Sequence, residues 1–217
     1  MVGDVAKRFL SPREEDRVEE VVRLAGQKMA EIEGQGGGHR ADLGPGLLDE
    51  LLEGTLLAAK DTYEKKKLPL IANLLGRAPF TGTPIPNLVG TLHLAEQLTY
   101  RQLCILAVVW PYDPWNGRPL TNRPLNELFA IKPLTEDIQG PVFDLFFLYE
   151  RQLVMPLRGG QLIAGVGPGD LIPAELRLTY PALLLFNGME LAGIPPEDRD
   201  EILRVLGANG LAPSKQG

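Results

Sequence analysis

The chain has few side chains that could hold a metal ion. His39 and His93 are its two histidines, and they lie far apart in the sequence. Neither belongs to an H-E-x-x-H motif, and the one cysteine has no second cysteine to complete a zinc site. His93 and Glu96 are three residues apart, which is typical of an ordinary polar pair on one helix face. We therefore expect no metal site and no cofactor.

Nucleophilic and phosphate-binding motifs are also weak. Cys104 lies in the apolar run Leu103–Val109, where a thiolate forms with difficulty, so we expect a small buried side chain. The glycines of Gly165–Gly169 lack a G-K-[ST] ending, and Pro168 has no N–H to offer a phosphate. The chain contains no G-x-S-x-G motif. We predict no catalytic residues and expect that the protein is not an enzyme.

A proline-rich aromatic segment is a stronger candidate for binding. Trp110, Tyr112 and Trp115 lie within a few residues of one another and include both tryptophans of the chain. Aromatic side chains are favoured anchors at protein interfaces. The segment is therefore either a partner site or a lid whose rings are buried against the core.

A second candidate is an apolar stripe on the first predicted helix. Val18, Val22 and Met29 recur at helical spacing, among charged residues of both signs. We expect this stripe to pack on the rest of the chain, on a partner, or on a second copy of the chain.

The charge balance argues against nucleic acid as the main partner. The net charge is -6 and the pI is about 5.1, whereas phosphate binding needs exposed lysine and arginine. A local basic surface stays open as an alternative, and Lys65–Lys67 form the one basic run. The residues of that alternative are Lys65, Lys66, Lys67, Arg151, Arg158 and Arg177.

These residues must be positioned by helices over most of the chain. Ser11 and Glu14 form an S-x-x-E capping box with Pro12 at the first helical position, which predicts a first helix. A glycine-rich linker follows at 34–46. A second helical pattern starts near Leu47, and we expect Pro69 to kink or divide it.

The second half predicts short helices, two strands and two closing helices. Helix 142–154 is apolar on most sides, as expected for a buried element. The other expected elements are helices over 100–110 and 122–130, strands at 161–164 and 175–178, and helices that begin after Thr179 and at Pro195.

This order of elements resembles a degenerate winged helix-turn-helix domain. The segment Leu98–Leu103 is similar to the openings of first helices in that superfamily, and Leu176–Thr179 is similar to a second wing strand. The resemblance implies that helix 142–154 would enter the major groove of DNA. That helix offers only Arg151 and Gln152 as base readers, so the chain departs from the family at its functional position.

The first half resembles bacterial helical proteins of the abortive-infection alpha type. The similar segments are Glu64–Leu75 and Leu94–Thr99. The resemblance implies a bacterial protein in antiviral defence or a stress pathway, and it supplies no catalytic residues to carry over.

Together these patterns predict a mainly α protein with a winged-helix-like part and a small two-stranded β-hairpin. The expected parts are an N-terminal helix (1–33), the linker (34–46), a helical region (47–98), a winged-helix-like domain (99–206) and a flexible tail (207–217). One cysteine and the lack of an apolar leader or of about 20 consecutive apolar residues favour the cytoplasm.

The predicted function is a non-catalytic protein-interaction or regulatory module that binds a protein partner or a second copy. The first alternative is a winged-helix transcriptional regulator, which requires its basic residues to share one exposed surface. The second alternative is an enzyme of unknown class, which requires a pocket with converging polar groups near His93 and Glu96.

Overall fold

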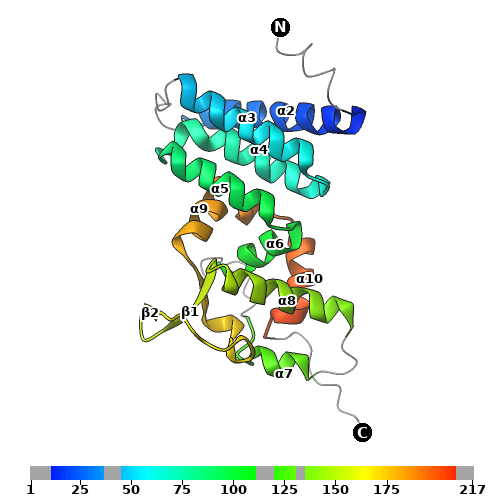
Figure 1. Ribbon diagram of the computed structural model, residues 1–217, viewed down its shortest axis with the longest axis vertical. Coiled ribbons are helices and arrows are strands. Elements are labelled where there is room, and N and C mark those ends of the chain that lie inside the picture. The colour runs from blue at the N-terminus through cyan, green and yellow to red at the C-terminus, as the bar shows by residue number, and fades with distance from the viewer. Residues whose placement is uncertain (1–10, 37–44, 111–119, 131–134, 209–217) are drawn as a thin grey trace. The chain divides into compact units, whose positions relative to one another are not determined.

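A computed structural model describes residues 11–36, 45–110, 120–130 and 135–208. The chain divides into two units. The first unit is Met1–Tyr100 with Asn187–Glu190, and the second is Arg101–Phe186 with Leu191–Gly217. Helices dominate the described residues, and one small antiparallel sheet accompanies them, so the predicted fold class is confirmed (Figure 1). The linker residues 37–44 and the tail from residue 209 lie outside the described residues.

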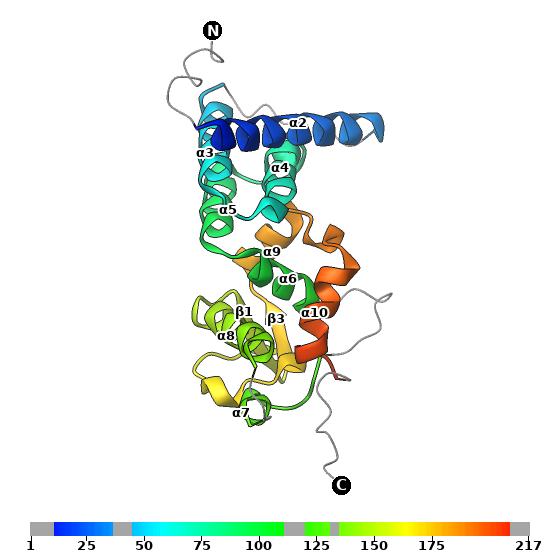
Figure 2. The ribbon, with the colours of Figure 1, turned by 90° about the vertical axis from the view of Figure 1, so that its right-hand side faces the viewer.

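The first unit is built from helices α2 (Pro12–Gly34), α3 (Pro45–Asp61), α4 (Leu68–Arg77) and α5 (Ile85–Gln97), with the 3₁₀ turns Lys65–Lys67 and Ala78–Phe80. The predicted start of α2 is confirmed, because the backbone N–H of Ser11 donates to the Glu14 carboxylate at 2.6 Å. This hydrogen bond, supported by the Ser11 side chain, holds the pKa of Glu14 below its ordinary value. Figure 2 shows α2 lying across α3 and α4.

A glycine allows α2 and α4 to approach each other closely. Val21 and Ala25 are the buried side chains of α2, which packs on α4 and α3. A Cβ atom on Gly76 would lie 2.8 Å from Cβ of Lys28 and 2.9 Å from the Ala25 carbonyl oxygen. Any side chain at residue 76 would therefore push the two helices apart.

The break in the second helical pattern lies earlier in the chain than predicted. We expected Pro69 to interrupt one long helix, but α3 already ends at Asp61 and α4 begins at Leu68. Pro69 thus occupies the first turn of α4, where a missing N–H leaves no hydrogen bond unmade.

The second unit contains helices α7 (Leu125–Phe129), α8 (Glu136–Glu150) and α10 (Pro196–Leu206), and most of α6 (Tyr100–Val109) and α9 (Tyr180–Gly188). Short 3₁₀ turns occupy Pro168–Asp170, Pro173–Glu175 and Leu191–Gly193. The predicted burial of Cys104 is confirmed, since the α6 segment that carries it lies in the core.

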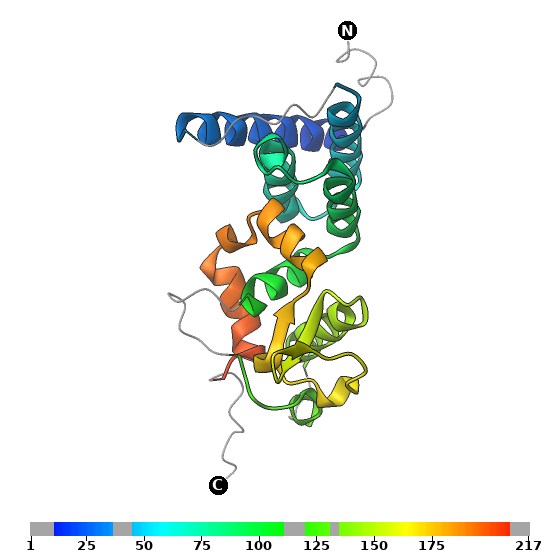
Figure 3. The same ribbon diagram turned by 90° about the vertical axis from the view of Figure 1, so that its left-hand side faces the viewer.

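The sheet has three strands in the order β2-β1-β3, drawn in yellow in Figure 3. They are β1 (Val154–Arg158), β2 (Gln161–Leu162) and β3 (Leu176–Leu178), and both β2 and β3 pair with β1 in antiparallel register. A small hairpin was expected from 161–164 and 175–178. The hairpin is instead β1–β2, and the strand at 176 pairs on the other side of β1.

The predicted helix 142–154 is α8 in the structure, and both of its predicted ends are wrong. The helix begins six residues earlier, at Glu136, so Pro141 lies inside it. It ends in a Schellman motif with Gln152 in the left-handed region at φ 56°, where Leu153 N–H donates to Leu148 at 2.9 Å and Gln152 N–H to Tyr149 at 2.8 Å. Val154 therefore starts β1 instead of closing the helix.

Candidate protein-binding face

Helix α8 divides its side chains between the interior of the second unit and the solvent. Its buried side chains are Ile138, Pro141, Val142, Leu145 and Leu148. At about 100° per residue, these positions form one stripe, and a second stripe lies opposite to it. The opposite stripe, which we call the α8 face, consists of Glu136, Gln139, Phe143, Phe147 and Glu150.

Aromatic rings form the middle of the α8 face. Phe143 is 54 % exposed, and its ring centroid lies 5.6 Å from that of Phe129 on α7. Phe147 is half-buried beneath Arg151, whose Cζ atom is 4.5 Å from the ring centroid. The expectation that this helix is buried on most sides is therefore wrong at Phe143. Aromatic side chains are favoured anchors at protein interfaces, which makes this exposed ring a candidate contact.

Carboxylates flank these rings along the helix. Glu136 and Glu150 are exposed, and neither makes a hydrogen bond or an ion pair with another described residue. Each lies seven residues from Phe143, which is two helical turns. The α8 face therefore offers an apolar centre between two negative charges.

A third carboxylate on α8 is already paired. Asp144 accepts hydrogen bonds from Arg101 and, at 2.8 Å, from the side-chain amide of Gln102. The Arg101 guanidinium also lies against Gly140, where a Cβ atom would be 2.8 Å from its Nη1. Arg101 and Asp144 neutralise each other at one edge of the face, so the negative charge stays with Glu136 and Glu150.

The arginines of the DNA-binding alternative do not form one basic surface. Arg158 pairs with Glu175 at 2.7 Å, and Arg177 donates to the carbonyl oxygens of Ala174 and Leu176 at 3.0 and 2.7 Å. Arg177 is the cross-strand partner of Met155. Because side chains alternate along a strand, Arg158 and Arg177 point to opposite faces of the sheet. Arg151 lies on the ring of Phe147 in α8.

The basic run Lys65–Lys67 belongs to the first unit and is divided between solvent and interior. Lys65 and Lys66 are exposed, whereas Lys67 is only 4 % exposed. Its Nζ atom donates to the carbonyl oxygens of Leu98 at 2.6 Å and Glu96 at 3.4 Å, at the end of α5. Burial lowers the pKa of Lys67, and the carboxylates of Glu64 and Glu96 oppose that shift. Lys67 thus caps α5 and is not available to an outside ligand.

A pocket of about 350 Å³ opens beside this lysine, within the first unit. The pocket is lined by the acidic residues Asp61, Glu64 and Glu96 and by the exposed Tyr63. Glu64 accepts from the Tyr100 N–H at 2.9 Å, and Glu96 pairs with His93 at 3.2 Å, as the spacing of that pair predicts. Both Glu64 and Glu96 are therefore already engaged by other groups of the chain.

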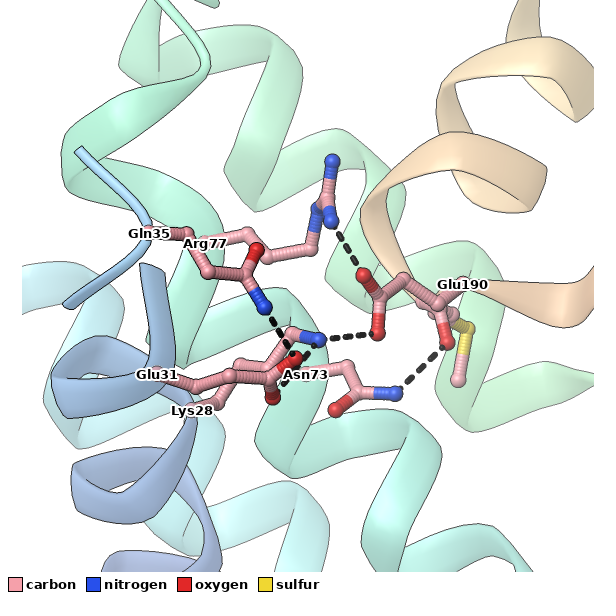
Figure 4. Close-up of polar contacts among 7 residues, drawn as sticks. Lys28, Glu31, Gln35, Asn73, Arg77 and Glu190 are labelled. Atoms are coloured by element: carbon pink, nitrogen blue, oxygen red, sulfur yellow. Dashed lines mark hydrogen bonds and ion pairs between the residues drawn. The ribbon is translucent and has the colours of Figure 1, made fainter. Parts of the chain in front are cut away.

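A polar cluster fixes Glu190 within the first unit (Figure 4). The Glu190 carboxylate accepts from Lys28 at 2.7 Å and from Arg77, while Asn73 donates to the carbonyl oxygen of Met189 at 3.2 Å. Burial alone would lower the pKa of Lys28, but hydrogen bonds to Glu190 and Glu31 outweigh it and raise that pKa. Glu190 has φ 53°, a conformation that favours glycine, so side-chain contacts compensate for a strained backbone.

The predicted partner residues lie in different places. Val22 on α2 is 48 % exposed, and Val18 and Met29 are half-buried, so the stripe is only partly open. Trp110 is half-buried and stacks on Phe186 at 4.9 Å between ring centroids. Tyr112, Trp115 and His39 lie outside the described residues.

Sequence reasoning missed the α8 face itself. The exposed stripe contains every third or fourth residue from Glu136 to Glu150, and this period is visible in the sequence. The period stays hidden when the helix is predicted to begin at residue 142, because that start leaves Glu136 and Gln139 outside it. Across the described residues, no three histidine, cysteine or acidic side chains are close enough to hold a metal ion.

No family model, no curated protein and no solved structure matches this chain. Within the residues that the structure describes, no helix is both long and apolar enough to cross a membrane.

Proposed function

We propose that this chain is a non-catalytic protein-interaction module that binds a partner protein through the α8 face. The observation that carries the proposal is the exposed ring of Phe143, flanked two turns away on each side by the exposed carboxylates of Glu136 and Glu150, which pair with no other described residue. Such a surface repels phosphate and suits an apolar contact with a charged rim.

The dispersal of the arginines supports a protein partner over DNA. A groove-reading helix needs cations or amides along its exposed stripe, whereas the α8 face has Gln139 alone of that kind, with Arg151 just beyond its C-terminal end. Arg158 and Arg177 are held by Glu175 and by backbone carbonyls on opposite faces of the sheet.

The biological setting of the proposal rests on the sequence alone. The single cysteine supports a cytoplasmic protein, and the resemblance of the first half supports a bacterial defence or stress pathway. Self-association through Val18, Val22 and Met29 stays a prediction, and the exposure of Val22 leaves room for it.

Site-specific photo-crosslinking in the organism's own cells tests this function. A photoreactive phenylalanine analogue replaces Phe143 in the full chain, and the matched control carries it at Tyr180, which is 65 % exposed in the same unit. We expect a discrete protein adduct from residue 143 that is absent from residue 180. Nucleic-acid adducts, no adduct, or equal adducts from both positions would contradict the proposal.

A further inference from the structure

We propose that the partner of the α8 face is a basic helical segment, with one large apolar side chain between two cations. The inference rests on the proposed function and adds the chemistry of the partner. It follows from the charges of Glu136 and Glu150 and from their spacing about the exposed ring of Phe143.

The spacing along α8 sets the spacing in the partner. Seven residues separate Phe143 from each glutamate, and at about 1.5 Å per residue each glutamate is about 10 Å from the ring along the axis. A partner helix that lies along α8 meets both carboxylates when its cations are seven residues before and after its apolar anchor. Phe129 and Phe147 extend the apolar surface that the anchor would cover.

A second copy of α8 is a poor occupant of the same face. In an antiparallel pair centred on Phe143, Glu136 of one copy meets Glu150 of the other at both ends. In a parallel pair, each glutamate meets its own equivalent. Either symmetric arrangement places like charges together, which opposes association. The face therefore favours a partner of opposite charge.

The two ends of the face differ in their remaining charge. Arg151 follows Glu150 directly and lies on Phe147, so a cation already stands near the C-terminal carboxylate. Glu136 has the exposed Asp137 beside it, and Arg204 approaches Asp137 only to 4.0 Å. We therefore expect the partner's cation near Glu136 to contribute more than the one near Glu150.

The test uses two synthetic helical peptides of about 20 residues, long enough to form an appreciable helix. Each has leucine at its centre, and the basic peptide has arginine seven residues to either side, where the acidic peptide has glutamate. Fluorescence anisotropy measures their binding to the full chain at low ionic strength. We expect the basic peptide to bind about tenfold more tightly than the acidic one.

Charge reversal on the protein makes the test specific to the α8 face. The double variant Glu136→Lys and Glu150→Lys should prefer the acidic peptide, and a gain of binding cannot come from misfolding. Glu136→Lys alone should weaken the basic peptide more than Glu150→Lys alone. The matched control, Glu197→Lys with Glu201→Lys on α10, makes the same change in net charge at exposed positions and should keep the original preference.

Equal binding of the two peptides would overturn the inference, as would an equal effect of the α10 control. A protein adduct at residue 143 together with equal peptide binding would leave the proposed function in place and reject only the basic partner. Loss of the adduct itself would reject the proposed function.

Discussion

Replacing Glu190 with alanine should lower the free energy of unfolding by about 2 kcal/mol. The side chain of Lys28 is 15 % exposed, so its hydrogen bond to Glu190 contributes about 1.5 kcal/mol, at the lower end for charged groups. Arg77 and Glu190 are 32 % and 29 % exposed, and solvent screening reduces their pair to about 0.5 kcal/mol. Urea denaturation followed by helical circular dichroism measures the sum.

A glycine variant separates the backbone contribution from the ion pairs. Glu190→Gly removes the same carboxylate but relieves the left-handed φ of 53°, so it should be more stable than Glu190→Ala by about 1 kcal/mol. Equal stability of the two variants would show that residue 190 carries no backbone strain. An unchanged free energy in both would refute the assignment of Glu190 as the centre of the cluster.

The same cluster predicts a dependence on pH. Glu190 and Glu31 raise the pKa of Lys28 above its ordinary 10.5, so the folded state holds this proton more tightly than the unfolded state. The resulting stabilisation is complete below 10.5 and is lost as pH rises through the raised value. The difference between wild type and Glu190→Ala should therefore shrink at strongly alkaline pH. A stability difference that grows at alkaline pH would contradict a raised pKa of Lys28.

Three further changes have defined outcomes in the same denaturation assay. Gln152→Gly should stabilise the protein by about 0.5–1 kcal/mol, because glycine suits the left-handed end of α8; a loss of stability would contradict the Schellman motif. Lys67→Met should destabilise it by about 1–3 kcal/mol, because two carbonyls at the end of α5 lose their donor, whereas Lys65→Met at an exposed position should have little effect. Gly76→Ala should cost about 1–3 kcal/mol by separating α2 from α4, and an unaltered midpoint would refute that close approach.

Local signals in the sequence were enough to locate most helices. The Ser11–Glu14 box marks the start of α2, and the last helix, predicted to begin at Pro195, begins one residue later at Pro196, because caps and prolines act within one turn. The buried segment around Cys104 also follows from its apolar composition. These features depend on neighbouring residues only.

The errors arose where a proline has an unusual place. Pro141 lies inside α8, and Pro156 lies in β1, the middle strand of the sheet, where a residue without an N–H argues against a strand. The carbonyl oxygen of Pro156 still accepts from Ile163 N–H at 2.9 Å. Tertiary packing holds both prolines in these elements, and the neighbouring residues in the sequence carry no information about that packing.

Contacts between distant residues explain what the sequence left open at the candidate sites. Glu190 pairs with Arg77, which is 113 residues away in the sequence, and Lys67 donates to the carbonyl oxygen of Leu98, which is 31 residues away. A run of three lysines gives no sign that one of them is buried, since that depends on where α5 ends. The α8 face, by contrast, has a helical period that becomes visible once the helix is extended to Glu136.

An amide NMR titration of the full chain with the basic peptide tests the central claim most directly. The account predicts that shift changes concentrate on the α8 face, around Gln139, Phe143 and Phe147, and that duplex DNA leaves these signals in place. Shift changes concentrated on other helices, or a response of α8 to the duplex, would contradict it.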